Sequence, residues 1–127
     1  CNIMTQPGET EGYSAYDHIE AIEKHSYKGM IEWCVANKAG IPEEIKKRYL
    51  DDGAEPVRID YERLSEAGVR VLTGDFTSIR DGLVRHDPEK LARAIIELVA
   101  ESVLAKDKRR KIDYYYVKDR LKKLAKG

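Results

Sequence analysis

Apolar residues along this chain follow two different spacings, which alternate from one segment to the next. A spacing of three and four residues, typical of helices with one buried face, predicts helices at 14–25, 41–50, 61–67 and 87–103. Alternating or continuous apolar runs, typical of strands, predict extended segments at 1–4, 30–36, 56–60, 69–73 and 83–84. Because strands and helices follow one another, we expect an α/β fold, with a Rossmann-like, largely parallel sheet flanked by helices.

The densest apolar runs, Ile31–Val35 and Val69–Leu72, favour strands that are covered on both faces. We expect the helix at 87–103 to cover one face of the sheet. At least three of four segments should share that sheet, and these are 1–4, 31–36, 57–59 and 69–73. Ser14 and Asp17 form a capping pair at one helix start, and Asp87 precedes a first-turn proline at another.

The last part of the chain differs in character from the rest. Between 106 and 126 there are ten Lys and Arg residues against three Asp, so this stretch carries +7 and the rest of the neutral chain −7. Apolar residues recur there at helical spacing: Tyr114, Val117, Leu121 and Leu124. We therefore divide the chain into an α/β portion at 1–104 and a basic amphipathic helix at 105–127. Docking onto its own or a neighbouring subunit is the favoured role of this helix, with membrane-surface or nucleic-acid binding and disorder as alternatives.

Length and composition exclude several classes of protein. The 127 residues fit one domain, and a formal net charge of zero gives no overall case for nucleic-acid binding. No apolar run approaches the roughly 18 residues of a membrane-spanning helix. Two cysteines, Cys1 and Cys34, form neither a metal motif nor a disulfide framework, and Cys34 between Trp33 and Val35 is expected to be a buried free thiol. This usage of cysteine fits a reducing, cytoplasmic location.

Uncharged polar side chains follow two of the predicted strands. Asn2, Thr5 and Gln6 lie where the first strand gives way to a loop, and Asn37 follows the strand at 30–36. Amide and hydroxyl groups at such places orient sugar hydroxyls or a nucleotide base. The alternative is a turn that these side chains stabilise themselves, with Pro7 and Gly8 setting a tight bend.

A basic pair lies directly before a predicted helix. Arg85 and His86 precede the helix that Asp87 caps, and an arginine near free helix N–H groups suits a phosphate or carboxylate. Two arguments oppose this hypothesis: Asp87 competes for the same N–H groups, and Arg85 has nearby acidic residues, Asp75 and Asp81, as ion-pair partners.

The residues alone supply no catalytic machinery. His86 has no partner nucleophile or carboxylate at a known geometry. His18 and His25 are seven residues apart, a spacing that gives no zinc motif, and His18 is expected to be a structural histidine. No glycine spacing matches a phosphate-binding loop. We therefore expect neither a catalytic residue nor a metal ligand in this chain.

Three separated stretches resemble motifs of one known family. They are CNIMTQPGETEGY at 1–13, IPEE at 41–44 with GAEPV at 53–57, and GLVRHDP at 82–88. Together they are similar to the gluconeogenesis factor family, the YvcK branch of the CofD-like superfamily. Family members resemble one another in a glycine-rich nucleotide loop near their N-terminus, and this chain shows none. The resemblance therefore implies the C-terminal part of a larger CofD-like domain.

The resemblance also implies a function and a site. It implies a regulatory protein that binds UDP-N-acetylglucosamine and serves gluconeogenic growth and control of cell shape and the cell wall, with no certain cofactor. Arg85, and more weakly His86, would contact the nucleotide sugar, and the loop with Asn2, Thr5 and Gln6 would share the site. Related sequences commonly have an Asn pair where this chain has Ala36-Asn37, so Asn37 alone is the candidate there. Partners would be the remainder of the same subunit and a second copy.

An enzyme is the alternative from the same superfamily. CofD itself transfers a phospholactyl group from a guanosine-linked donor to a deazaflavin precursor with the assistance of Mg²⁺. Such chemistry needs carboxylates clustered near the phosphates. The sequence offers no dense acidic cluster beside Asn2–Gln6 or Arg85, and this favours the regulator.

Overall fold

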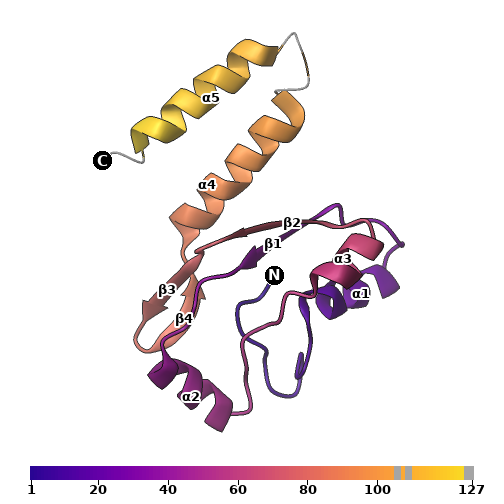
Figure 1. The fold of residues 1–127 in the computed structure, drawn as a ribbon, viewed down its shortest axis with the longest axis vertical. Coiled ribbons are helices and arrows are strands. Elements are labelled where there is room, and N and C mark those ends of the chain that lie inside the picture. The colour runs from indigo at the N-terminus through magenta and orange to yellow at the C-terminus, as the bar shows by residue number, and fades with distance from the viewer. Residues whose placement is uncertain (105–106, 108–109, 125–127) are drawn as a thin grey trace. The chain divides into compact units, whose positions relative to one another are not determined.

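The structure is a computed structural model that describes residues 1–104, 107 and 110–124 (Figure 1). It divides into two compact units, Cys1–His86 and Asp87–Gly127. The first unit holds α1 (Ala15–Lys24), β1 (Trp33–Asn37), α2 (Glu43–Asp51), α3 (Tyr61–Glu66), β2 (Arg70–Gly74), β3 (Thr77–Arg80) and β4 (Leu83–His86). The second holds α4 (Pro88–Val99), a π-helical stretch η1 (Ala100–Leu104) and α5 (Lys111–Leu124).

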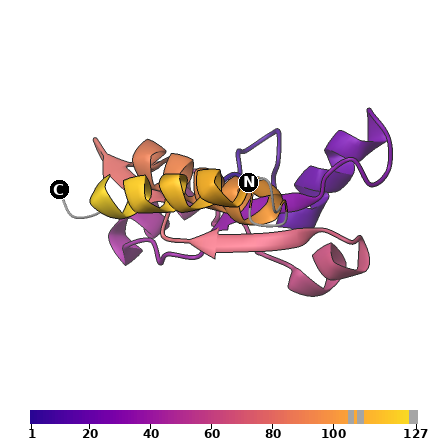
Figure 2. The same ribbon diagram turned by 90° about the horizontal axis from the view of Figure 1, so that it is seen from above.

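A parallel pair of strands forms the centre of the first unit. β1 pairs with β2 in a register that runs from Trp33–Arg70 to Asn37–Gly74. Figures 1 and 2 both show α1 and α3 toward the same end of this pair. The buried core joins these helices to one face of the strands, through Ala15, Ile19, Cys34, Ala36, Leu64 and Val69. The predicted α/β fold with parallel strands and flanking helices is confirmed.

Cys34 is a free thiol in this core, as predicted. Burial raises the pKa of the Cys34 thiol, because the charged thiolate loses its hydration there.

The prediction that three or more segments share one parallel sheet is wrong. In the described residues β1 and β2 form a two-stranded sheet, and the segments near 1–4 and 56–60 pair with each other instead. They run antiparallel around one bridge between Met4 and Pro56, flanked by Thr5 N–H to the Glu55 oxygen at 2.7 Å and Val57 N–H to the Ile3 oxygen at 2.9 Å. Pro56 has no N–H to donate, which limits this ladder to a short contact.

A hairpin that the hydrophobic pattern did not reveal completes the first unit. β3 and β4 pair antiparallel across Asp81 and Gly82, whose φ angles are 53° and 71°. Two consecutive positive φ angles are typical of the type I′ turn, for which Asp-Gly is a favoured sequence. The extended piece predicted at 83–84 is confirmed as part of β4, whereas β3 was not predicted.

The helices begin near their predicted starts. At α1, Ser14 and Asp17 form the predicted reciprocal capping box. At α4, the Asp87 side chain accepts hydrogen bonds from the backbone N–H groups of Glu89 and Lys90, both at 3.1 Å. Among the described residues, no helix is both long enough and apolar enough to cross a membrane.

The second unit is a helical hairpin in which α5 packs against η1. Leu121 is buried and Tyr114 and Val117 are half-buried, as the predicted apolar face requires. Leu124 is 68% exposed at the last residue of the helix, so its predicted burial is wrong. The predicted helix start at Ala105 lies outside the described residues.

A partly buried polar network joins α1 to α3. The Ser14 hydroxyl donates to the Asp60 carboxylate at 2.6 Å, and the Tyr16 backbone N–H donates to the same carboxylate at 3.0 Å. The Arg63 guanidinium bridges Asp60 and Asp17 at 3.1 and 2.9 Å. Burial acts to raise the pKa of Asp60, but these hydrogen bonds and Arg63 outweigh it and the net pKa is lowered. The pKa of Asp17 is lowered mainly by the Ser14 backbone N–H.

Replacing Asp60 tests this network. Asp60→Ala leaves the Tyr16 N–H without its acceptor, whereas the Ser14 hydroxyl still has Asp17 within 2.8 Å. A buried donor without a partner costs about 1–3 kcal/mol. We expect the free energy of unfolding at pH 7, measured by urea denaturation, to fall by that amount. Glu62→Ala, at an exposed position in α3, is the control and should change the free energy of unfolding by less than about 0.5 kcal/mol. Equal losses in the two variants would contradict the role of Asp60.

Acid should narrow the difference between wild type and Asp60→Ala. Because the pKa of Asp60 is lower in the folded chain, its ionised form stabilises the fold above the unfolded pKa of about 3.9. This contribution is lost as the pH falls through the folded value. The stability gap should be constant between about pH 5 and pH 8 and shrink below about pH 4. A gap that acid leaves unchanged would show that the charge of Asp60 is unimportant.

The pairing of Thr5 with Glu55 can be tested in the same way. Thr5 is 2% exposed, and its Oγ1 accepts the Glu55 N–H at 2.9 Å. Thr5→Val keeps the shape of the side chain and removes that acceptor, so we expect a loss of about 1–2 kcal/mol in unfolding free energy and a lower Tm by calorimetry. Thr10→Val removes a comparable hydrogen bond to the exposed Gln6 N–H and should cost less. A larger loss for Thr10→Val would contradict this ranking.

Candidate functional site

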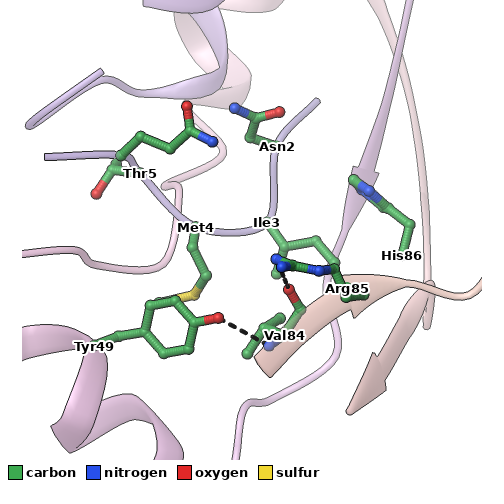
Figure 3. Close-up of a pocket in the computed structure, with 9 residues that line it drawn as sticks. Asn2, Ile3, Met4, Thr5, Tyr49, Val84, Arg85 and His86 are labelled. Carbon is green, nitrogen blue, oxygen red and sulfur yellow. Dashed lines mark hydrogen bonds between the residues drawn. The ribbon is translucent and has the colours of Figure 1, made fainter. Parts of the chain in front are cut away.

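The loop that follows Cys1 and strand β4 meet at a hollow of about 180 Å³ (Figure 3). It is lined by Asn2, Ile3, Met4, Thr5, Gln6, Tyr49, Val84, Arg85 and His86. The structure thus brings together the predicted site residues from the two ends of the first unit. Asn37 lies outside this hollow.

The lining has an apolar part and a polar part. Ile3, Met4 and Val84 form a small buried cluster, and Ile41, Ile45 and Tyr49 pack against it. Polar side chains come from both sides of this cluster, with Asn2 and Gln6 on the loop and Arg85 and His86 on β4. An apolar surface with a few convergent polar groups is the usual composition of a small-molecule site.

Arg85 is exposed, and the fold makes little use of its charge. Its Nη1 donates to the backbone oxygen of Val84 at 3.4 Å, a long contact within its own strand, which Figure 3 shows. Among the described residues its guanidinium makes no ion pair, so the alternative of a structural pair with Asp75 or Asp81 is not what the structure shows. The guanidinium is therefore available to an anion.

The start of α4 is not a free anion site. Asp87 accepts the N–H groups of Glu89 and Lys90 with one carboxylate oxygen. A negative group from the chain itself thus occupies the place that a phosphate would take at this helix start. The case for an anion at Arg85 therefore rests on its own guanidinium.

His86 is half-buried and hydrogen-bonded to the backbone. Its Nε2 lies 3.1 Å from the oxygen of Cys1, and because a carbonyl only accepts, Nε2 carries the hydrogen. Burial lowers the pKa of His86, because the charged imidazolium loses its hydration there. A neutral His86 leaves Nδ1 as an acceptor and makes the side chain a hydrogen-bonding group at neutral pH.

The three residues of the loop differ in their freedom. Thr5 is buried, and its hydroxyl oxygen accepts the Glu55 N–H, so its main role is to fix the loop. Asn2 and Gln6 are exposed, and within the described residues their side-chain amides make no hydrogen bond. These two amides and Arg85 are the lining groups that the fold leaves for a ligand.

Asn37 lies in a separate hollow, with its amide already engaged. Its Oδ1 accepts the Phe76 N–H at 2.9 Å, and its Nδ2 donates to the Ala39 oxygen at 3.1 Å. The hollow around it, about 240 Å³ in volume, is also lined by Lys38 and Lys46. One amide end thus supports the turn after β1 and the other the segment after β2, and the ligand-binding role of Asn37 stays a prediction.

Tyr49 is a lining residue that the sequence analysis did not name as part of the site. It lies in α2 with Ile45, and both side chains pack against the buried cluster. The hydroxyl reaches the backbone N–H of Val84 at 2.9 Å. No local pattern in the sequence indicates this contact, because 35 positions separate the two residues.

The geometry suits binding of an anionic, hydroxyl-rich molecule. Arg85 supplies a charge, the amides and His86 supply directed hydrogen bonds, and the apolar cluster supplies a surface for packing. Across the described part of the chain, no three or more His, Cys, Asp or Glu residues are grouped so that they could hold a metal ion.

Comparison with known proteins places this geometry in a family. A family model described as 2-phospho-L-lactate transferase CofD matches residues 1–77. A putative gluconeogenesis factor of Clostridium acetobutylicum is 39% identical over 95% of this chain and 27% of its own length. The gluconeogenesis factor of Bacillus subtilis is 39% identical over 80% of this chain and 32% of its own.

A solved structure agrees with these matches. The crystal structure of a UPF0052 family protein from Bacillus halodurans is similar with a TM-score of 0.71 and 37% identity, and it covers 75% of this chain and 31% of that one. The chain thus spans only about a third of the length of the relatives it matches. From the family match over residues 1–77 and the named relatives, the chain belongs to the CofD family, among the gluconeogenesis factors.

Proposed function

We propose that this chain contributes a nucleotide-sugar site to a regulatory protein of the gluconeogenesis-factor type, with UDP-N-acetylglucosamine as the ligand. The observation that carries the proposal is the hollow that gathers Arg85 with the amides of Asn2 and Gln6. The two amides make no hydrogen bond among the described residues, and the guanidinium makes one long contact through Nη1. The diphosphate would pair with the guanidinium, and the sugar hydroxyls with the amides. His86 would add a neutral hydrogen-bonding group.

The names of the relatives support the physiological part of the proposal. Two similar proteins are named as gluconeogenesis factors, and a regulator that senses a cell-wall precursor would link growth on gluconeogenic carbon sources to cell-shape control. Because the chain spans about a third of these relatives, the rest of such a protein would supply further contacts to the ligand. We propose a cytoplasmic location, where nucleotide sugars are made. A homo-oligomer would be compatible with the exposed apolar residues of the helices.

A phospholactyl transferase is the second candidate, because the matching family model carries that description. Metal-assisted transfer needs carboxylates beside the phosphates to hold Mg²⁺. The residues that line the hollow include no Asp or Glu, so this site fits binding better than transfer. Under the transferase alternative, Mg²⁺ would be held by groups outside the hollow and its removal would abolish activity.

Arg85→Ala tests the proposed site. Loss of a charge-assisted contact to a diphosphate costs about 1.5–3 kcal/mol, so we expect UDP-N-acetylglucosamine to bind about 10- to 150-fold more weakly. Calorimetric titration of the full-length protein gives the affinity, and circular dichroism checks the fold. Arg85→Lys should recover only part of the loss, since an ammonium does not reproduce the planar fork of a guanidinium.

The control is Arg58→Ala, an exposed arginine that does not line the hollow. Its affinity should equal that of wild type. If folded Arg85→Ala bound the ligand as well as wild type, the assignment of Arg85 would be wrong. Affinity that depends on Mg²⁺, together with product formation from a phospholactyl donor, would instead favour the transferase.

A further inference from the structure

The register of the β3–β4 hairpin leaves the backbone of Val84 facing outward. The turn at Asp81-Gly82 has two residues, so the flanking pair Arg80–Leu83 is the hydrogen-bonded one. The next pair, Ile79–Val84, is then a non-hydrogen-bonded pair. The N–H and C=O of Val84 therefore point away from β3, toward the side of the hairpin where the hollow lies.

Helix α2 takes up the first of these two groups. The Tyr49 hydroxyl accepts the Val84 N–H at 2.9 Å, and Figure 3 shows the tyrosine oxygen directed at that nitrogen. Val84 is 5% exposed, so water has little access to replace the bond. Without Tyr49 Oη this N–H would be a buried donor with no partner, a state that folded chains avoid.

Arg85 takes up the second group. Its Nη1 donates to the Val84 oxygen at 3.4 Å. Tyr49 and Arg85 therefore contact the two backbone polar groups of the same residue. The same helix also touches the turn of the hairpin. A Cβ built on Gly82, whose φ is +71°, would lie 2.6 Å from Arg48 Nη1, so the Arg48 side chain is packed against the turn. Neighbouring residues of α2 thus hold the hairpin at its turn and at its middle.

We propose that Tyr49 is a positioning residue for Arg85. Its hydroxyl fixes the Leu83–Val84 peptide against α2, and the position of Val84 sets where the guanidinium of the next residue lies over the hollow. The inference rests on the proposed function for the identity of the ligand, but the geometric coupling of Tyr49 to Arg85 can be measured without any ligand.

Tyr49→Phe is the decisive variant, because it keeps the packed ring and removes the oxygen alone. Tyr61→Phe is the matched control, since Tyr61 begins α3, is 54% exposed and does not line the hollow. In the ligand-free full-length protein we expect the Val84 amide of Tyr49→Phe to exchange with deuterium about tenfold faster. Modification of Arg85 by phenylglyoxal should also be severalfold faster relative to Arg58 in the same molecule. Both rates should be unchanged in Tyr61→Phe.

A double-mutant cycle then tests the connection to binding. Tyr49→Phe should weaken UDP-N-acetylglucosamine affinity about tenfold in the wild-type background and less than about twofold in the Arg85→Ala background. A merely structural role for Tyr49 would weaken binding by the same factor in both backgrounds. Arg58→Ala in place of Arg85→Ala should leave the tenfold effect intact.

Each result bears on one of the two proposals. Unchanged Val84 exchange and unchanged Arg85 modification in folded Tyr49→Phe would overturn the positioning role, and so would equal losses in the two backgrounds. Failure of the wild-type protein to bind UDP-N-acetylglucosamine would overturn the proposed function instead. The two ligand-free rates would in that case still decide the role of Tyr49.

Discussion

The short antiparallel contact between residues 3–5 and 55–57 is the constraint on which the site depends. Without it, the loop after Cys1 would have no fixed position against the rest of the first unit. Thr5 and Glu55 exchange two hydrogen bonds: the Thr5 N–H donates to the Glu55 oxygen, and the Thr5 hydroxyl oxygen accepts the Glu55 N–H. Thr5 itself is buried. This contact brings Ile3 and Met4 onto Val84, and the hollow is what remains beside that packed cluster.

The polar residues named as site candidates fall into two groups, those that support the fold and those that are exposed to solvent. The side chains of Thr5 and Asn37 make hydrogen bonds to backbone groups and so hold loops in place. The amides of Asn2 and Gln6 make no hydrogen bond among the described residues, and Arg85 uses only Nη1, in a long contact to Val84. All three side chains are exposed. Polar groups that point into a hollow without a structural partner have no stabilising role there, and this makes them the better candidates for ligand contacts.

The helices and strands could be predicted from the sequence more reliably than the way in which the strands pair. Helical spacing and capping residues located α1, α2 and α4, because these signals act over a few neighbouring residues. The segments near 1–4 and 56–60 were correctly seen as extended, but whether they run parallel to β1 or antiparallel to each other depends on contacts far apart in sequence. Pro56 carried a clue, since a residue without an N–H is unsuited to an interior strand.

The sequence named residues that the structure places around one hollow, but it did not give their geometry, and their role in ligand binding stays a prediction. Asn2, Thr5, Gln6, Arg85 and His86 were all singled out from the sequence, and the structure brings them to one hollow. The sequence did not separate the buried, hydrogen-bonded Thr5 from the free amides beside it, because burial is a property of the packed chain. It also gave no sign of Tyr49 Oη, whose partner is a backbone group rather than a side chain.

The bond from Val84 to Tyr49 has a consequence for how copies of this chain meet one another. A two-stranded hairpin has two open edges, and the outward N–H and C=O groups of an edge strand are a template on which another chain can add a strand. On β4 the Val84 N–H is occupied by Tyr49 and its C=O by Arg85. The contact that aims the arginine therefore also closes the middle of this edge, and it protects the hairpin against aggregation by strand addition.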